Sequence, residues 1–259
     1  MRRRVGIGVA LVVTAVLGSA VASGEVYRAG NLQIAFDGSF APNSLPRERA
    51  VPVTVSVSGR IATTDGSHPP PLRWLRVELN RNAHLSTAGL PICRPSSVQS
   101  TSSRGALARC QSALVGRGTF AAELNGAGKA IPTSGRILVF NARAAGRPLL
   151  LLHLYWTTPI QASSVLALRV HRQAKGEFGV ALTARLPKLA GDVGSITRIE
   201  LEIGREYRYR GERRGYLSAR CAAPDGSTAV PFAFARGTFR LAGGTDLETS
   251  LTRICQVRG

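Results

Sequence analysis

The densest group of side chains with binding chemistry lies between residues 205 and 220. This segment contains six arginines and three tyrosines: Arg205, Arg208, Arg210, Arg213, Arg214 and Arg220, with Tyr207, Tyr209 and Tyr216. Guanidinium groups bind phosphates and carboxylates through paired hydrogen bonds, and nearby tyrosine rings suit sugars or cations. If the chain turns near Gly211, strand alternation places Tyr207 and Tyr209 on one face of a hairpin and Arg208 and Arg210 on the other. The segment predicts a binding surface for anionic polymers. The alternative is a soluble edge hairpin whose charges prevent aggregation between sheets.

Motifs for catalysis or metal binding are missing from the sequence. The four histidines, His68, His84, His153 and His171, have no metal-ligand spacing, and the chain has no Gly-x-Ser-x-Gly elbow. His153 lies within an apolar segment and is predicted to be a core imidazole with satisfied hydrogen bonds. The alternative is a buried base beside an acid. We therefore predict no catalytic residues, no metal ligands and no cofactor.

The carboxylates leave one enzymatic alternative open. Glu78, Glu200 and Glu202 are expected at solvent-facing strand positions, as solvated charges. A carboxylate pair for glycoside hydrolysis need only meet in space, however. A wall-glycan hydrolase therefore stays an alternative, and two carboxylates sharing a cleft would favour it.

Residues 1–22 have the layout of a secretory signal peptide. Three arginines precede an apolar run from Val5 to Leu17, and small residues form an A-x-A site ending at Ala22. An uncleaved anchor is the alternative, because the apolar stretch approaches membrane-spanning length. We predict cleavage after Ala22, export, a mature body over 23–259, and no transmembrane span after cleavage.

The charge of the chain is strongly positive. It has 34 lysines and arginines against 15 acidic residues, a formal charge of +19, and removing the three signal-peptide arginines leaves +16. A high-GC genome explains the preference for arginine over lysine but not the excess of base over acid. Long-range attraction that salt weakens draws such a protein to anionic envelope polymers or a lipid surface. Nucleic acid is recognised by the same residue types, but export makes it a poor partner in vivo.

Four cysteines in an oxidising compartment predict disulfides. Three connectivities are possible, and we favour Cys93–Cys110 and Cys221–Cys255 because each pair is local. A zinc site is disfavoured, since the sequence has no Cys-x-x-Cys and no histidine at ligand spacing from a cysteine.

Short segments of alternating apolar and polar residues predict β-strands. The alternation is clearest in 53–58, 75–80 and 198–203. Further strands are expected at 26–36, 113–124, 136–142, 149–156, 165–171, 178–186, 216–221, 231–241 and 247–255. Residues 149–156 are apolar on both faces, which is typical of a central strand covered on both sides. Turn signals such as Asp65-Gly66 and Gly191-Asp192 separate the segments.

About twelve closely spaced strands predict an all-β, antiparallel sandwich. One short helix is expected near 102–110, capped by Thr101 or Ser102.

A faint internal repeat is also visible in the sequence. Residues 75–79 resemble 199–203, and each is followed by a cysteine and then by Arg-Gly-Thr-Phe, at 117–120 and 236–239. The repeat predicts related halves at 50–140 and 176–259, with coincidence between amphipathic strands as the alternative.

Six local patterns stand out along the chain, at 89–94, 106–116, 118–120, 209–211, 216–221 and 251–255. Together they resemble a family of uncharacterised exported proteins from high-GC Gram-positive bacteria. The resemblance covers most of the mature chain and implies export and β structure. It implies no activity and no catalytic residues.

The sequence therefore predicts a secreted or envelope-associated basic protein, monomeric and without enzymatic activity, that binds anionic polymers through residues 205–220. A first alternative is a structural or assembly protein of the envelope that meets a protein partner through a sheet edge. An exposed apolar strand, rather than a basic cleft, would favour this alternative. The second alternative is the wall-glycan hydrolase.

Overall fold

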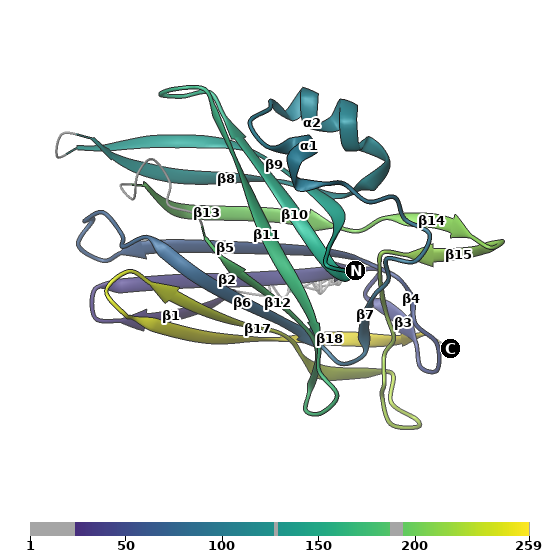
Figure 1. Cartoon of the computed structure of the whole chain (residues 1–259). Helices are drawn as coiled ribbons and strands as arrows, with labels where there is room; N and C mark the ends of the chain where they lie inside the picture. Colours follow the sequence, from purple (N-terminus) through teal and green to yellow (C-terminus); the bar gives the residue numbers. More distant parts are fainter. Residues whose placement is uncertain (1–23, 127–128, 187–193, 259) are drawn as a thin grey trace, which may run out of the picture.

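The computed structural model describes residues 24–126, 129–186 and 194–258, and it confirms an all-β protein (Figure 1). The predicted signal peptide and the Gly191-Asp192 turn lie outside the described residues. Neither α-helix of the described part is long and apolar enough to cross a membrane. The strands are β1 (Glu25–Ala29), β2 (Leu32–Ala41), β3 (Ser44–Pro46), β4 (Val51–Pro52), β5 (Thr54–Thr63), β6 (Leu72–Asn80), β7 (Ala83–Leu85), β8 (Leu114–Gly126), β9 (Lys129–Ala144), β10 (Arg147–Trp156), β11 (Ala162–Arg172), β12 (Phe178–Arg185), β13 (Gly194–Ile203), β14 (Glu206–Tyr209), β15 (Glu212–Gly215), β16 (Leu217–Ala219), β17 (Ala229–Leu241) and β18 (Asp246–Arg258).

Thirteen of these strands form one continuous sheet in the order β1-β2-β5-β13-β8-β9-β10-β11-β12-β6-β17-β18-β3. All neighbours are antiparallel except β18 and β3. The sandwich expected from the sequence is thus a single curled sheet, whose inner face surrounds one apolar core. Curling brings β2 against β17 and β18, as two contacts show. Phe36 packs on Phe239 with ring centroids 5.8 Å apart, and Arg253 Nε donates to Gly38 O over 2.6 Å.

A second, smaller layer covers the outer face of β9 and β10. It consists of α1 (Pro95–Val98), α2 (Ser103–Cys110) and a 3₁₀ turn at Gln111–Ala113 (Figure 1). The side chain of Ser102 caps α2 by accepting a hydrogen bond from the Gly105 amide, which confirms the expected helix and its cap. The apolar core covers the inner face of these two strands and the helical layer covers the outer face. Residues 137–142 of β9 and 149–154 of β10 are therefore buried on both faces, as the apolar run at 149–156 predicted for β10.

The strand order repeats with one exchange. The six strands β1-β2-β5-β13-β8-β9 correspond in order to β10-β11-β12-β6-β17-β18, except that β13 and β6 have changed places between the halves. The registers also correspond: Val77 of β6 lies opposite Gly237, and Leu201 of β13 lies opposite Gly118, each glycine coming from an Arg-Gly-Thr-Phe segment. An internal duplication with an exchanged strand would produce this order over 25–144 and 147–258, which are wider than the halves predicted at 50–140 and 176–259. The duplication stays a hypothesis.

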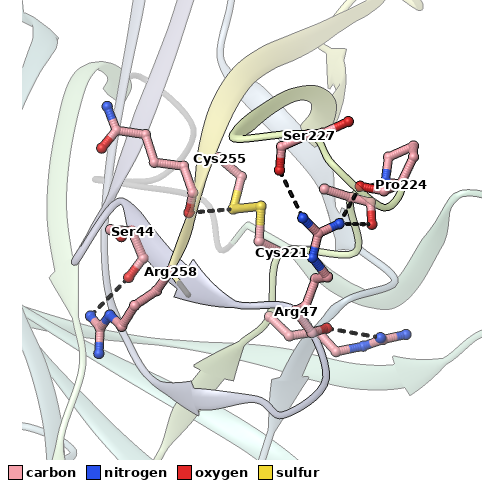
Figure 2. Close-up of a disulfide and its surroundings, with 10 residues drawn as sticks. Ser44, Arg47, Cys221, Pro224, Ser227, Cys255 and Arg258 are labelled. Atoms are coloured by element: carbon pink, nitrogen blue, oxygen red, sulfur yellow. Dashed lines mark hydrogen bonds between the residues drawn. A yellow bond between two sulfur atoms is a disulfide. The ribbon is translucent and has the colours of Figure 1, made fainter.

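Two disulfides confirm the favoured connectivity. Cys93–Cys110 closes the helical layer, and Cys221–Cys255 ties the loop after β16 to β18. Figure 2 shows Arg47 beside the second disulfide, with its guanidinium donating to Pro224 O and, over 2.8 Å, to Ser227 O. These bonds fix a loop that has no regular structure of its own.

Candidate anion-binding surfaces

Residues 206–215 form the hairpin that the sequence predicted. β14 and β15 pair antiparallel and turn at Arg210 and Gly211, whose φ angles are 52° and 80°. Positive φ at both central residues gives the two-residue turn whose twist matches the flanking strands, and glycine supplies the second position without strain.

The tyrosines of this hairpin attach it to the body of the protein. Tyr207 Oη donates to Ala88 O over 2.8 Å, and the ring of Tyr209 lies so close to Gly89 that an added Cβ would be 2.2 Å from it. Tyr216, just after β15, is fully buried, and this burial raises the pKa of its phenol. The three rings therefore serve packing, which leaves little aromatic surface for a ligand.

Most arginines of residues 205–220 also have protein partners. Arg205 donates to Leu114 O over 3.0 Å, Arg220 donates to Arg47 O over 3.3 Å, and Arg214 pairs with Glu212 over 2.7 Å. Arg213 pairs with Glu206. Within the described ranges, the guanidinium of Arg208 has no partner, and that of Arg210 lies 5.3 Å from the ring centroid of Tyr209. The structure brings the predicted residues 206–215 together in the hairpin, places Arg220 beside Arg47, and engages most of these side chains within the protein.

A second basic surface lies on the outer face of β11, β12 and β6, where sequence reasoning found no site. A groove of about 800 Å³ is lined by Trp74, Val165, Ala167, Arg169, His171, Thr183, Ala184, Arg185 and Leu186. A neighbouring depression of about 320 Å³ shares Arg169 and His171 and extends to Arg147 and Ala144. We call Trp74, Arg147, Arg169, His171 and Arg185 the basic strip.

The basic strip has unneutralised positive charge. Among the described residues that line the two depressions none is acidic, and the guanidinium groups of Arg147, Arg169 and Arg185 have no hydrogen bond, ion pair or ring contact with the rest of the described chain. Arg169 lies opposite Thr183, two residues from Arg185 on the neighbouring strand. Such diagonal neighbours are about 7–8 Å apart, so one anionic group or two adjacent ones can meet both arginines.

Trp74 stands at the end of this row of cations. It lies directly opposite Arg185 of β12 on one side and Arg240 of β17 on the other. The Arg240 guanidinium is 5.5 Å from the ring centroid and is held there by Asp246, with contacts of 2.8 and 2.7 Å. The hydrogen bonds from Arg240 lower the pKa of the Asp246 carboxyl, so this clamp stays ionised at neutral pH. The indole is thereby fixed beside Arg185, whose guanidinium has no partner among the described residues.

Next to the strip, Glu78 corrects an expectation from the sequence. It lies on the outer face of β6 as predicted, but its side chain is 2% exposed rather than solvated. Arg76 and Arg236 pair with its carboxylate over 2.8 and 2.6 Å, and Gln173 donates to it over 2.6 Å. Burial would raise the pKa of Glu78, but these hydrogen bonds outweigh it and hold the pKa below its ordinary value of 4.5. By contrast, Glu200 and Glu202 are solvent-accessible on β13, as expected.

His153 is the core imidazole that the sequence predicted, although only one nitrogen is satisfied. It is fully buried under the helical layer, and Nε2 lies 2.9 Å from Thr101 O, while Nδ1 has no partner among the described residues. Burial lowers the pKa of His153, so the ring is neutral at physiological pH. No acid contacts it in the described chain, which leaves the alternative of a catalytic base without support.

Three residues that the sequence did not connect form a chain resembling a catalytic triad. Glu123 Oε2 lies 3.0 Å from His68 Nδ1, and His68 Nε2 lies 3.1 Å from Ser195 Oγ. However, Ser195 is 1% exposed and its hydroxyl donates to Pro69 O over 2.7 Å. The loop that provides His68 also covers Ser195, so lifting it would remove the base together with the cover. We interpret the network as a latch for the proline-rich loop.

Comparison of the chain with protein-family models, curated proteins and solved structures found no match. The resemblance to exported β-rich proteins therefore stays a prediction. Within the described ranges, no three metal-binding side chains lie close enough together to hold an ion.

Glu78→Gln tests the clamp beside the strip. Because the substitution removes the charge between two arginines that remain partly exposed, we expect a loss of about 1–3 kcal/mol in the free energy of unfolding at pH 7. The lowered pKa means that the carboxylate stabilises the fold above about pH 4.5 and that this contribution fades as the pH falls further. The difference in the free energy of unfolding between variant and wild type should thus shrink in acid, as measured by urea unfolding.

Glu248→Gln, an exposed residue on β18, is the control and should change the free energy of unfolding by less than about 0.5 kcal/mol. A Glu78→Gln variant as stable as this control would contradict the clamp.

A fluorophosphonate probe tests the latch. Because the Ser195 hydroxyl is covered and donates its proton to a carbonyl, we expect no covalent labelling of the folded protein, as followed by intact mass. Stoichiometric labelling that disappears in Ser195→Ala would show that the Glu123–His68–Ser195 chain is a working nucleophile instead.

Proposed function

We propose that the protein is an exported, non-catalytic binding protein for anionic envelope or extracellular polymers, and that the polymer lies along the basic strip. One observation carries this proposal: two adjoining depressions share Arg169 and His171 and present three arginines that have no partner, and no carboxylate, among the described residues. The hairpin at 206–215 has similar residue types, but its arginines and tyrosines are largely engaged within the protein.

The shape of the strip suits a chain molecule better than a single small anion. Its cations run from Arg147 at the start of β10 across β11 to Arg185 at the end of β12, so successive anionic groups can each meet a guanidinium. Arginine contacts to phosphate, sulfate or carboxylate are charge-assisted and directional. The indole of Trp74 adds an apolar face with a polar edge, which suits a sugar ring.

Export and monomeric state belong to the proposal. The two disulfides are compatible with an oxidising compartment outside the cytoplasm. The net charge of +16 expected for the mature chain increases the encounter rate with anionic envelope material, in a way that salt reduces.

Binding a protein partner through a sheet edge is the second candidate. At the edge strand β1, Val26 and Tyr27 are 51% and 44% exposed, and β2 is the one described strand that pairs with β1. β18 approaches the other side of β1, however, which leaves little room for an added strand.

The glycan hydrolase has less support. A groove on the β2-β5-β13-β8 face is lined by three carboxylates, those of Asp37, Glu200 and Glu202. Two of them are paired with arginines, however: Asp37 with Arg253, and Glu200 with Arg198.

Binding to dextran sulfate, with uncharged dextran as the reference, tests the proposed strip. We expect the wild type to bind only the sulfated polymer, with affinity that falls as salt rises but survives moderate ionic strength. Arg169→Glu/Arg185→Glu should weaken binding at least about tenfold, because each charge-assisted contact contributes about 1.5–3 kcal/mol. Trp74→Ala should weaken binding to dextran sulfate more than binding to inorganic polyphosphate, which has no sugar ring.

Arg208→Glu/Arg210→Glu is the matched control because it changes the net charge by the same amount on the hairpin. Its affinity should fall by less than about threefold, through the general field alone. Circular dichroism checks that both double variants are folded. Equal losses of affinity in the two would mean that the positive charge acts without a specific site. A loss of affinity confined to the hairpin variant would instead place the binding site at residues 205–220.

A further inference from the structure

A cavity of about 110 Å³ lies inside the curled sheet, on the opposite face from the basic strip. Side chains from both halves of the strand order surround it, including Phe36 of β2, Leu75 of β6, Leu168 of β11 and Ile199 of β13. Only Arg60, Thr197 and Arg198 among its described lining residues have polar side chains. The cavity is lined by core residues and is nearly without hydrogen-bonding groups, and it is partly open to solvent rather than sealed.

Gly59 is the residue that leaves this space open. It alternates along β5 with the inward-facing Val57 and Ile61, and it lies between Phe36 and Ile199 in the sheet. A Cβ built on Gly59 would meet no atom within 4 Å, and its backbone has an ordinary strand conformation. The glycine is therefore not required by a turn or by close packing, and its missing side chain is part of the cavity.

The chemistry of the lining determines what can occupy the cavity. A buried water needs two to four polar partners, which this lining does not provide, whereas an apolar cavity of about 150 Å³ stays dry and binds benzene. We propose that the cavity is a binding site for an uncharged hydrocarbon group, either a small apolar molecule or one end of an alkyl chain. This site is independent of the basic strip: Leu168 faces the cavity while its neighbour Arg169 faces the groove outside.

Fluorobenzene, followed by fluorine NMR, is the probe that tests the site. We expect saturable binding to the wild type, and a loss of at least about tenfold in Gly59→Val, because the valine side chain would fill the cavity. The same variant should keep or raise the thermal midpoint, since it replaces a glycine in a strand and fills a void. Ser58→Val is the matched control, because it adds an equivalent apolar side chain to the outer face of β5 and should bind like the wild type.

Octanoate is the second probe and distinguishes the two sources of the hydrocarbon. Octanoate binding that Gly59→Val abolishes supports an alkyl chain as occupant, and binding of fluorobenzene alone supports a small uncharged molecule. The absence of saturable binding by either probe to the folded wild type would overturn the proposal. So would unchanged binding of both probes to a folded Gly59→Val variant.

Discussion

The insertion of β6 between β12 and β17 is the constraint on which the rest of the structure depends. β6 comes from the first half of the chain, while its neighbours come from the second half. This pairing alone places Trp74 beside Arg185, Glu78 beside Arg236, and Leu75 against the interior opposite β13. Because β13 is exchanged in the opposite direction, neither half can complete its own hydrogen-bond ladders. The groove outside and the cavity inside therefore exist only in the whole folded chain.

Strand alternation lets the same sheet form both an apolar interior and a charged exterior. Which exterior cations are free depends on the carboxylates beside them. Glu78 pairs with Arg76 and Arg236, and Asp246 pairs with Arg240. Within the described chain, Arg169 and Arg185 are left without a carboxylate partner. A buried carboxylate with two arginines stabilises the fold only while it is ionised and fully hydrogen-bonded. The local electrostatics, more than the net charge of the chain, thus select the surface proposed for binding.

Local patterns in the sequence predicted local structure well. Alternation identified most of the strands, an apolar run identified the doubly covered β10, and proximity identified both disulfide pairs. The single strand expected at 26–36 was wrong, because the chain turns at Gly30 and Asn31 and pairs β1 with β2. The exchange of β6 and β13 could not be predicted, because amphipathic strands pair equally well with many partners until the whole sheet closes. The basic strip was missed for that reason, since Trp74 and Arg169 are distant in sequence. The hairpin was predicted as a shape, but its contacts with residues 87–90 and 112–114 depend on where those loops lie. The burial of Glu78 likewise requires Gln173, which no spacing connects to it.

The measurement that tests the central claim most directly is the indole region of the ¹H–¹⁵N spectrum during titration with a sulfated oligosaccharide. The chain has two tryptophans, which makes the readout self-controlled. Trp74 lies in the groove, whereas Trp156 packs inside the sheet with its ring centroid 6.0 Å from that of Phe120. Binding along the basic strip predicts that the Trp74 indole signal shifts and saturates while that of Trp156 stays in place. Saturable binding that leaves the Trp74 signal unmoved would contradict the account and place the anion site elsewhere on the protein.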